Sequence, residues 1–324
     1  MLTYISRRLL YSIPVILIAT FLSFWAVRST FDPTAKVRVS RTGARAAEQI
    51  RQRLHLHDSI FEQYGFWLRD AAQGDLGDSE RTHEAVSTMI PRAFGNTLQL
   101  IGWAVLISGL VAVALGVYSA THQYSKLDYT FTGLSFIGLA MPAFWFGLIA
   151  IQWLAVWPKV TFNLNDPIFY TVGLHSGDQT GIFNLDYVRH LVLPVMTLCV
   201  LTIAEWSRFQ RASMLDVMSA DYIRTARAKG VPRRSVVVRH GLRNALIPLV
   251  TVIALDVGAL FGGAIITESI FSIDGMGRLF IDSINAGDAQ VLTAWVVITA
   301  VFIVVFNLLA DILYGVLDPR IRLS

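Results

Sequence analysis

Long hydrophobic runs alternate with polar segments along the chain. Six runs are nearly free of charged residues, and each is close to or above the roughly 20 residues that a helix needs to cross a hydrocarbon core of about 30 Å. We therefore predict an all-α integral membrane protein with six transmembrane helices. The predicted spans are Leu9 to Val27, Thr97 to Ala120, Tyr129 to Trp157, His190 to Trp206, Ala245 to Thr267, and Val291 to Leu313.

Four of these spans contain a proline: Pro14, Pro142, Pro194 and Pro248. Proline has no N–H to donate, so it leaves a backbone carbonyl free and permits a bend. Transporters use such bends, although proline is common in membrane helices generally.

The polar segment after the first span, residues 31–95, has a helical periodicity of its own. We predict two amphipathic helices, the second behind a capping box formed by Ser59 and Glu62. The sequence Gly74-Asp75-Leu76-Gly77 predicts a turn. From about Thr82, a further helix is expected to lead into the second span.

Composition and charge indicate the orientation. The chain is 54% hydrophobic and only 15% charged, which is typical of a membrane protein. Segment 208–243 carries nine basic and two acidic residues, whereas loops 158–189 and 268–290 are acidic on balance. The positive-inside rule therefore places 208–243, the turn at 121–128 and both termini in the cytoplasm. The same rule accounts for the excess of basic residues, so binding to nucleic acid is not needed to explain it. Segment 28–92 carries ten basic residues, but nine acidic ones lie among them and the segment is long enough to escape the rule, so it is expected outside.

The pattern divides the chain into three parts. Residues 1–30 form an N-terminal segment and the first transmembrane helix, expected to be a retained anchor because no convincing cleavage site follows it. Residues 31–95 form a helical extracytoplasmic insertion. Residues 96–324 form a five-helix core that includes the basic loop 208–243 and a cytoplasmic tail, 314–324.

Several kinds of chemistry are disfavoured. Cys199 is the only cysteine, so a disulfide or cysteine metal site within the chain is excluded. Gly258 and Gly263 have the glycine spacing of a phosphate-binding loop, but Ala264 and Ile265 replace its Lys and Ser/Thr. The chain is therefore not expected to hydrolyse ATP. It also lacks the Gly-x-Ser-x-Gly and His-Glu-x-x-His motifs that would favour an intramembrane hydrolase.

Polar side chains inside membrane spans usually face a bundle interior or an aqueous path. The candidates for lining a translocation pathway are Gln99, Gln152, Asp256, Glu268 and Asn307. Asp256 either lines the pathway or makes a structural hydrogen bond between helices. Asp256 and Glu268 are twelve residues apart on one helix, a rise of ~18 Å, which is too far for paired catalytic carboxylates.

Two further clusters remain ambiguous. Glu205 lies close to Arg208, so either an ion pair at the cytoplasmic edge or a pathway role is open. His55 and His57 suggest a metal site, but the exposed segment offers no further ligand. We expect a solvated pair and no metal.

Segment 221–230, followed by Val231-Pro232, predicts a short helix with a fixed end. Gly230 suits a left-handed cap, and Pro232 cannot continue the hydrogen-bond ladder. So short a helix is marginal in water, and its small residues would let another backbone approach, so docking on a partner is expected. A helix resting on anionic headgroups is the alternative. The residues assigned to this contact are Asp221, Tyr222, Ile223, Arg224, Thr225, Ala226, Arg227, Ala228, Lys229, Gly230 and Pro232.

Residues 221–248, DYIRTARAKGVPRRSVVVRHGLRNALIP, resemble the cytoplasmic coupling motif of ABC importer permeases, in the form typical of oligopeptide and dipeptide permeases. The resemblance covers nearly the whole chain and includes segments 1–14, 74–77, 255–271 and 317–322. The long outer segment after the first span resembles that of the B-type subunit of such a permease pair.

The chain departs from the general importer pattern, which is Glu-Ala-Ala, three residues, Gly, nine residues and Ile-x-Leu-Pro. Aligned on Gly230, it has Arg224-Thr225-Ala226 at the first three positions and His240-Gly241-Leu242-Arg243 at the last four. Peptide-type members of the family depart from the pattern in the same manner, so the departure favours the peptide-type subfamily. Asp274 stands where the family often has proline. This difference affects the expected shape of the local turn and not the expected function.

The resemblance implies a multi-pass subunit of a bacterial inner membrane importer of oligopeptides or dipeptides. Its expected partners are a second permease, two cytoplasmic ATPase domains or subunits, an extracytoplasmic substrate-binding protein and membrane lipid. ATP and Mg would be bound by the ATPases, so this chain would be a non-catalytic subunit with no cofactor of its own.

Two alternatives stay open. The same machine could import another solute, such as nickel chelates or sugars. A proton-coupled secondary transporter that uses Asp256 and Glu268 as carriers is less favoured, because it leaves segment 221–230 unexplained.

Overall fold

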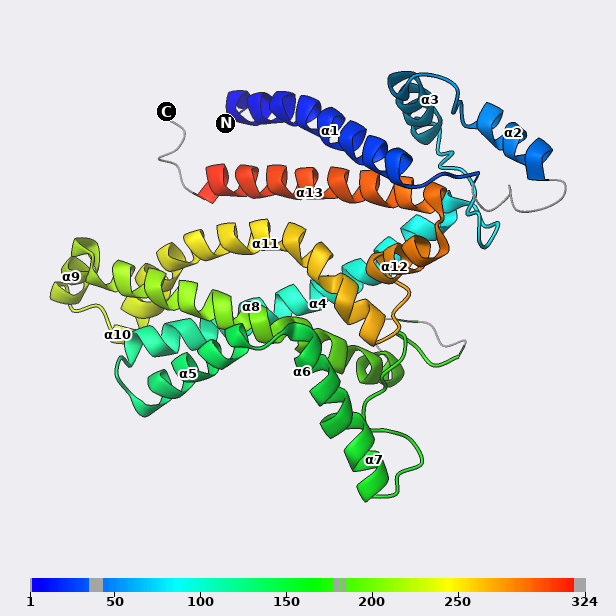
Figure 1. Ribbon diagram of the computed structural model, residues 1–324. Coiled ribbons are helices and arrows are strands. Elements are labelled where there is room, and N and C mark those ends of the chain that lie inside the picture. The colour runs from blue at the N-terminus through cyan, green and yellow to red at the C-terminus, as the bar shows by residue number, and fades with distance from the viewer. Residues whose placement is uncertain (1, 35–42, 178–180, 182–183, 318–324) are drawn as a thin grey trace. The chain divides into compact units, whose positions relative to one another are not determined.

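A computed structural model describes residues 2–34, 43–177, 181 and 184–317 (Figure 1). These residues are helical apart from turns, loops and one isolated bridge between Asp78 and Ala85. The elements are α1 (Leu2–Thr30), α2 (Gly43–Arg53), α3 (Ile60–Ala72), α4 (Val86–Thr121), α5 (Lys126–Ala140), α6 (Ala143–Ala150), the π-helical η2 (Ile151–Val156), α7 (Trp157–Thr161), α8 (Leu185–Ser219), α9 (Asp221–Ala228), α10 (Arg233–Ser235), the π-helical η3 (Val236–Leu242), α11 (Arg243–Ile270), α12 (Met276–Ala286) and α13 (Ala289–Leu317).

Six segments of the described chain are long and apolar enough to cross a membrane, in agreement with the number predicted. Helices α4 and α8 extend beyond their predicted spans, because hydrophobicity marks only the part of a helix that suits hydrocarbon. The helix expected from about Thr82 starts instead at Val86. The residues just before it form a turn closed by the bridge at Ala85.

The third predicted span is wrong in one respect: it is not a continuous helix. α5 ends at Ala140 and α6 begins at Ala143, with Met141 and Pro142 in extended conformations. The proline ring clashes with a helical residue before it, and this clash explains why Met141 leaves the helix. α6 and α7 then lead away from α5 in a new direction (Figure 1).

The chain divides into two compact units, one formed by residues 98–273 with the segment from 309, the other by residues 2–97 and 274–308. In the first unit, α8 packs against α5, α6 and α11. Two glycines, one on each side of the break at Pro142, allow α5 and α6 to lie close to α8. A Cβ on Gly138 would lie 3.2 Å from the Ala204 Cβ, and one on Gly147 would lie 3.2 Å from the side chain of Thr197.

The second unit contains the described part of the segment that follows α1. The predicted capping box is confirmed: Ser59 Oγ accepts from the Glu62 amide, and a Glu62 carboxylate oxygen accepts from the Ser59 amide at 2.9 Å. α3 packs on α1, where Phe61 stacks on Phe21 and the hydroxyls of Tyr64 and Thr20 lie 2.7 Å apart.

The turn predicted at residues 74–77 is present. Gly74 and Gly77 have left-handed φ angles of 87° and 80°. Gly77 donates its amide to the Asp75 carboxylate at 2.8 Å. The chain that follows is anchored within the same unit, because Ser79 Oγ donates to the buried carboxylate of Asp288 at 2.5 Å.

Candidate functional site

The short basic helix α9 ends as the sequence predicted. The Gly230 amide donates to the Arg227 carbonyl at 3.0 Å, and the Val231 amide donates to the Ala226 carbonyl at 3.2 Å. Together these bonds form a Schellman motif, which satisfies carbonyls that the helix end leaves free. Gly230 has a φ of 75°, so the motif needs a residue that tolerates left-handed backbone.

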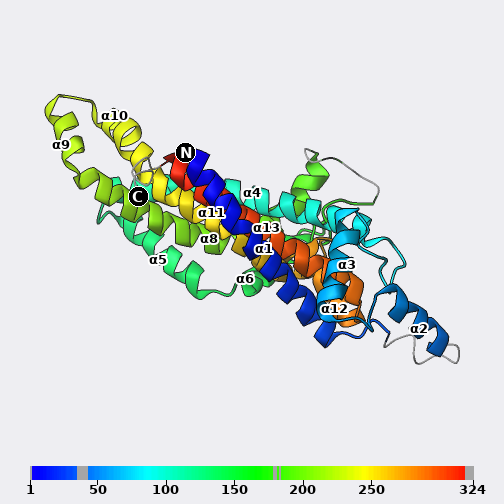
Figure 2. The ribbon, with the colours of Figure 1, turned by 90° about the horizontal axis from the view of Figure 1, so that it is seen from above.

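One side of α9 is attached to the rest of its unit, where it packs against α8 and η3. Ile223 is completely buried, and Asn244 donates from Nδ2 to the Tyr222 hydroxyl at 3.1 Å. α9 and α10 lie beyond the Ser219 end of α8 (Figure 2). An apolar anchor and a capped end therefore hold this short helix in place.

The other side of α9 is exposed. Arg224, Arg227 and Lys229 are exposed, as are Asp221, Thr225, Ala228, Gly230 and Pro232, while Ala226 is half-buried. The exposed set combines three cations with small residues. Such a surface can pair with carboxylates or carbonyl groups while allowing close backbone approach.

The π-helix η3 follows the basic helix and was not predicted. Its Gly241 is buried against the end of α8, where a Cβ would lie 2.8 Å from Met214 Cε and 3.2 Å from Met218 Sδ. Only a residue without a side chain fits there unless the methionines move. A lone glycine in an otherwise helical sequence is the signal that could have indicated this close contact.

The turn between α4 and α5 is joined to the same region. Arg211 on α8 donates from Nε and an Nη atom to the two carboxylate oxygens of Asp128, each at 3.0 Å. Asp128 also accepts from the Tyr124 amide at 3.0 Å. The hydrogen bond from Arg211, supported by that amide, lowers the pKa of the Asp128 carboxyl despite its burial. Arg233 on α10 donates to the Thr121 carbonyl at 3.2 Å.

The candidate pathway residues occupy separate environments. Asp256 on α11 accepts from Trp206 Nε1 on α8 at 2.7 Å, so the interhelical hydrogen bond that the sequence left open is present. Gln99 accepts from the Tyr187 hydroxyl at 3.0 Å within the core. The remaining three differ in burial: Glu268 is completely buried, and Gln152 and Asn307 are exposed.

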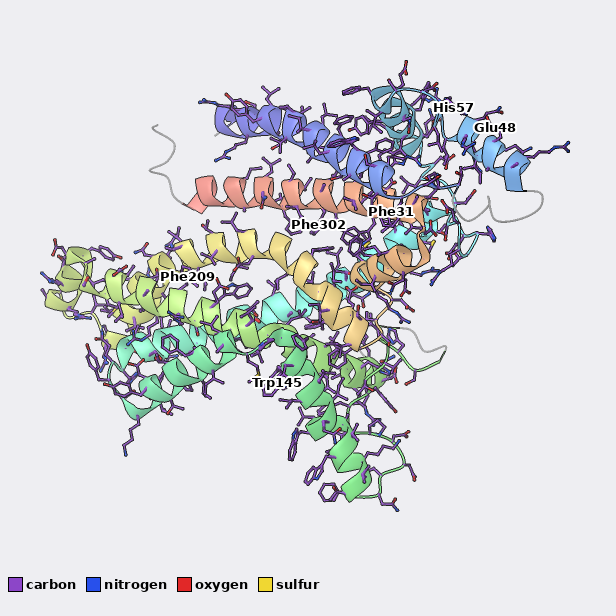
Figure 3. All side chains as sticks on the ribbon, viewed as in Figure 1. Phe31, Glu48, His57, Trp145, Phe209 and Phe302 are labelled. Carbon is purple, nitrogen blue, oxygen red and sulfur yellow. The ribbon has the colours of Figure 1, made fainter. Side chains whose placement is uncertain are left out.

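The two ambiguous clusters are resolved in part. Within the described chain, Glu205 and Arg208 form no ion pair; the Arg208 guanidinium instead lies over the Phe136 ring, 4.7 Å from its centroid. His55 and His57 contact different carboxylates. His55 lies 3.0 Å from the carboxylate of Asp58. His57 lies 3.2 Å from that of Glu48 (Figure 3).

The unusual residue Asp274 lies in the turn before α12. Its carboxylate pairs with Arg278 at 2.9 Å, one helical turn ahead, and its carbonyl accepts from Asn96 Nδ2 at 2.9 Å. Arg278 and Asn96 therefore hold this turn, at the position where the family that the sequence resembles was expected to have proline.

Comparison with known proteins gives a consistent result. Residues 112–323 match the model of the family described as "Binding-protein-dependent transport system inner membrane component". The chain is 42% identical over 325 residues to the oligopeptide transport system permease protein AppB of Bacillus subtilis, covering 99% of this chain and 100% of the relative. It is 36% identical over 340 residues to the dipeptide transport system permease protein DppB of Escherichia coli, covering 99% of each. The glutathione transport system permease protein GsiC, also of E. coli, is 34% identical over 99% of each chain.

Proposed function

Because the chain belongs to the family of inner membrane components of binding-protein-dependent transport systems, we propose that it is one of two permease subunits of an ATP-driven ABC importer of dipeptides or oligopeptides. The chain is a multi-pass protein of the bacterial inner membrane. Its full-length similarity to permeases named for oligopeptides and dipeptides supports the cargo. The observation that carries the mechanism is α9, which is anchored on one side and exposes cations on the other.

Force would enter the subunit through α9. When the partner ATPases close on ATP, their surface moves the exposed side of α9, and Ile223 with η3 passes the displacement to α8 and α11. Such transmission requires a helix that does not slide or unwind. The Schellman cap at Gly230 and the buried Ile223 meet that requirement.

The orientation follows from the same assignment. α9, the turn at 121–128 and both termini face the cytoplasm, and the insertion of residues 31–95 faces outward, where it receives the binding protein. ATP and Mg are held by the ATPase subunits, and this chain serves as a non-catalytic subunit with no metal or cofactor of its own.

The pathway lies between this chain and the second permease. We assign Asp256 to its wall, because the residue is half-buried and Trp206 holds its carboxylate at the α8–α11 contact. Gln99, Gln152, Glu268 and Asn307 are further candidates for positions along the route. A peptide needs such wet and tolerant surroundings, because its backbone groups must stay hydrated or paired.

The decisive experiment is uptake of labelled di- to hexapeptides into vesicles that contain this chain with its co-purifying partners, with and without internal ATP. ATP-dependent peptide uptake supports the proposal. ATP dependence confined to a nickel chelate or a sugar would keep the machine and replace the cargo. Uptake that is indifferent to ATP would contradict the coupling role of α9 and favour a secondary transporter.

A further inference from the structure

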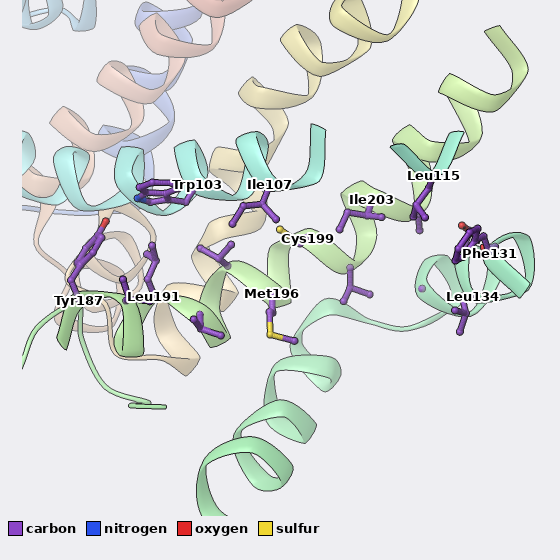
Figure 4. A pocket seen from close by; sticks show the side chains of 17 residues that line it. Trp103, Ile107, Leu115, Phe131, Leu134, Tyr187, Leu191, Met196, Cys199 and Ile203 are labelled. Carbon is purple, nitrogen blue, oxygen red and sulfur yellow. Dashed lines mark hydrogen bonds between the residues drawn. The ribbon is translucent and has the colours of Figure 1, made fainter. Parts of the chain in front are cut away.

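A polar pocket lies in the second unit, around the segment that follows α1. Its volume is about 370 Å³, within the range of about 300–1,000 Å³ that is common for small-molecule sites. Its walls come from the end of α2, from α3, from the turn at residues 74–77 with the residues after it, and from the start of α13. The larger groove around Cys199 in the first unit is lined mainly by apolar side chains (Figure 4). The pocket in the second unit, by contrast, has polar groups that can select a ligand.

Gln290, at the start of α13, brings a buried amide to this pocket. The residue is only 8% exposed, and it lines the pocket. Its side chain makes no hydrogen bond to the part of the chain that the structure describes. The amide lies against Gly77, since a Cβ on that glycine would be 3.3 Å from Gln290 Oε1. Buried amides normally have a hydrogen-bond partner, so this one is suited to hold a polar group of a ligand.

Asp75 supplies a negative charge beside that amide. One of its carboxylate oxygens accepts from the Gly77 amide at 2.8 Å, and Gln290 lies against the same glycine. Among the described residues, no cation lies within ion-pair distance of Asp75. Arg53 also lines the pocket, but its guanidinium pairs with Asp78 at 3.5 Å. The charge of Asp75 therefore remains available to a cation that enters the pocket.

The rest of the lining includes an apolar wall, formed by Ile50, Leu54, Trp67 and Leu76. Glu80 adds a further carboxylate to the lining. Within the described chain, no group of three His, Cys, Asp or Glu residues could hold a metal ion. An apolar wall beside a carboxylate and an amide fits an organic cation with a hydrocarbon stem.

We propose that this pocket binds an alkylammonium group, the chemistry of a lysine side chain. The ammonium has three N–H donors, which can bond to the Asp75 carboxylate and to Gln290 Oε1 while the stem lies along the apolar wall. An anion is disfavoured, because it would face Asp75. The group can belong to a free basic solute or to a lysine on the extracytoplasmic binding protein. Only the outward placement of the pocket rests on the orientation proposed above.

Saturation-transfer NMR of the assembled, detergent-solubilised importer tests this site, with Nα-acetyl-lysine methylamide as the probe. Nα-acetyl-norleucine methylamide has the same stem without the charge and should bind at least about fivefold more weakly. Asp75→Asn keeps an acceptor for the Gly77 amide, so the turn should persist. This variant should weaken binding of the lysine probe about fivefold, the effect of one charge contact open to solvent. Asp58→Asn, which removes an exposed carboxylate outside the pocket, is the control and should change nothing.

A second variant tests the buried amide. Gln290→Leu keeps a side chain of similar volume and loses no hydrogen bond within the described chain, so the complex should stay as stable as the wild type. Binding of the lysine probe should weaken about threefold, the effect of one hydrogen bond. Equal affinity for the lysine and norleucine probes would overturn the proposal, as would lysine affinity that neither Asp75→Asn nor Gln290→Leu alters.

A further measurement identifies the source of the ammonium group. If Asp75→Asn also weakens the affinity of the importer for its purified binding protein, a lysine of that protein occupies the pocket. If that affinity is unchanged while the lysine probe is lost, the natural ligand is a free basic solute. Because binding is read without transport, failure of this proposal is distinct from failure of the peptide importer assignment.

Discussion

Arg211 on α8 holds Asp128, at the start of α5, through two hydrogen bonds of 3.0 Å each. The Asp128 side chain is 4% exposed, so its charge is nearly removed from water and depends on this partner. Asp128→Asn should lower the free energy of unfolding by about 1.5–3 kcal/mol, the range for a hydrogen bond to a charged group. Thermal dissociation of the detergent-solubilised complex measures the loss.

An exposed pair provides the control for that loss. Arg69 and Asp70 lie 3.2 Å apart on α3, outside the surface assigned to the ATPases, and both side chains are exposed. Asp70→Asn should change the dissociation temperature little, because exposed ion pairs contribute almost nothing. Equal losses in the two variants would show that burial of Asp128 has no special weight.

The same buried pair predicts sensitivity to acid. Folding lowers the pKa of Asp128, chiefly through the hydrogen bond from Arg211. Its contribution is therefore complete above the pH range in which an ordinary aspartate titrates, and it is lost as the pH falls through the lowered pKa. Between about pH 7 and about pH 3, the wild-type complex should lose more stability than Asp128→Asn. Parallel pH profiles would refute this assignment.

α4 packs closely on α8 at Gly116, and this contact predicts the effect of a substitution there. A Cβ on Gly116 would lie 2.6 Å from the Gln210 Cβ and 2.9 Å from the Arg211 amide nitrogen, and the backbone cannot move aside. Gly116→Ala should therefore destabilise the subunit by about 1–3 kcal/mol. Gly102→Ala on the same helix meets no atom within 4 Å and should be nearly neutral. The two dissociation temperatures decide the matter, and a stable Gly116→Ala variant would contradict the close contact.

Local features of the fold could be predicted because neighbouring residues encode them. The capping box of Ser59 and Glu62 depends on a spacing of three residues, and the Gly230 cap depends on a glycine followed by Pro232. The six apolar spans could be predicted because each is a run of roughly 20 apolar residues, the length that a helix needs to cross the hydrocarbon core. Each of these signals lies within a single segment of the chain.

Features that join distant segments could not be predicted in this way. The Asp128–Arg211 pair spans 83 positions, and neither residue has a pattern that names the other. At Pro142 the sequence predicts a bend, whereas the helix is interrupted there, because a proline is compatible with either a kinked or a broken helix. The partner of Asp256 likewise depends on how α8 and α11 meet.

The carboxylate of Asp256 is expected to interact with cationic peptides. Asp256→Asn keeps an acceptor for Trp206 Nε1, so the subunit should remain folded while the charge is lost. ATP-driven uptake of lysine-containing peptides should fall about fivefold relative to neutral peptides, which corresponds to about 1 kcal/mol of lost charge interaction. Trp206→Phe, which leaves the charge without its donor, is the control for position. Unchanged uptake of every peptide by Asp256→Asn would remove this residue from the pathway.

The cap of α9 yields the most direct test of coupling. Gly230 has a φ of 75°, and no atom lies within 4 Å of the position that a Cβ would occupy, so a substitution there strains the backbone without creating a clash. Gly230→Val should cost about 1–3 kcal/mol locally and loosen the end of the helix. We expect more ATP hydrolysed per peptide imported, with insertion and assembly unchanged. The ratio of phosphate released to peptide taken up measures the effect.

Gly177 supplies the matched control for Gly230. It also has a left-handed φ, 56°, with no atom within 4 Å, but it lies in the loop before α8, at the end of that helix opposite α9. Gly177→Val carries the same kind of backbone strain and should leave the ratio of ATP to peptide unchanged. If both Gly230→Val and Gly177→Val raise the ratio of ATP to peptide, general destabilisation of the subunit would explain the effect of Gly230→Val. Normal coupling in Gly230→Val would mean that force does not pass through the capped end of α9.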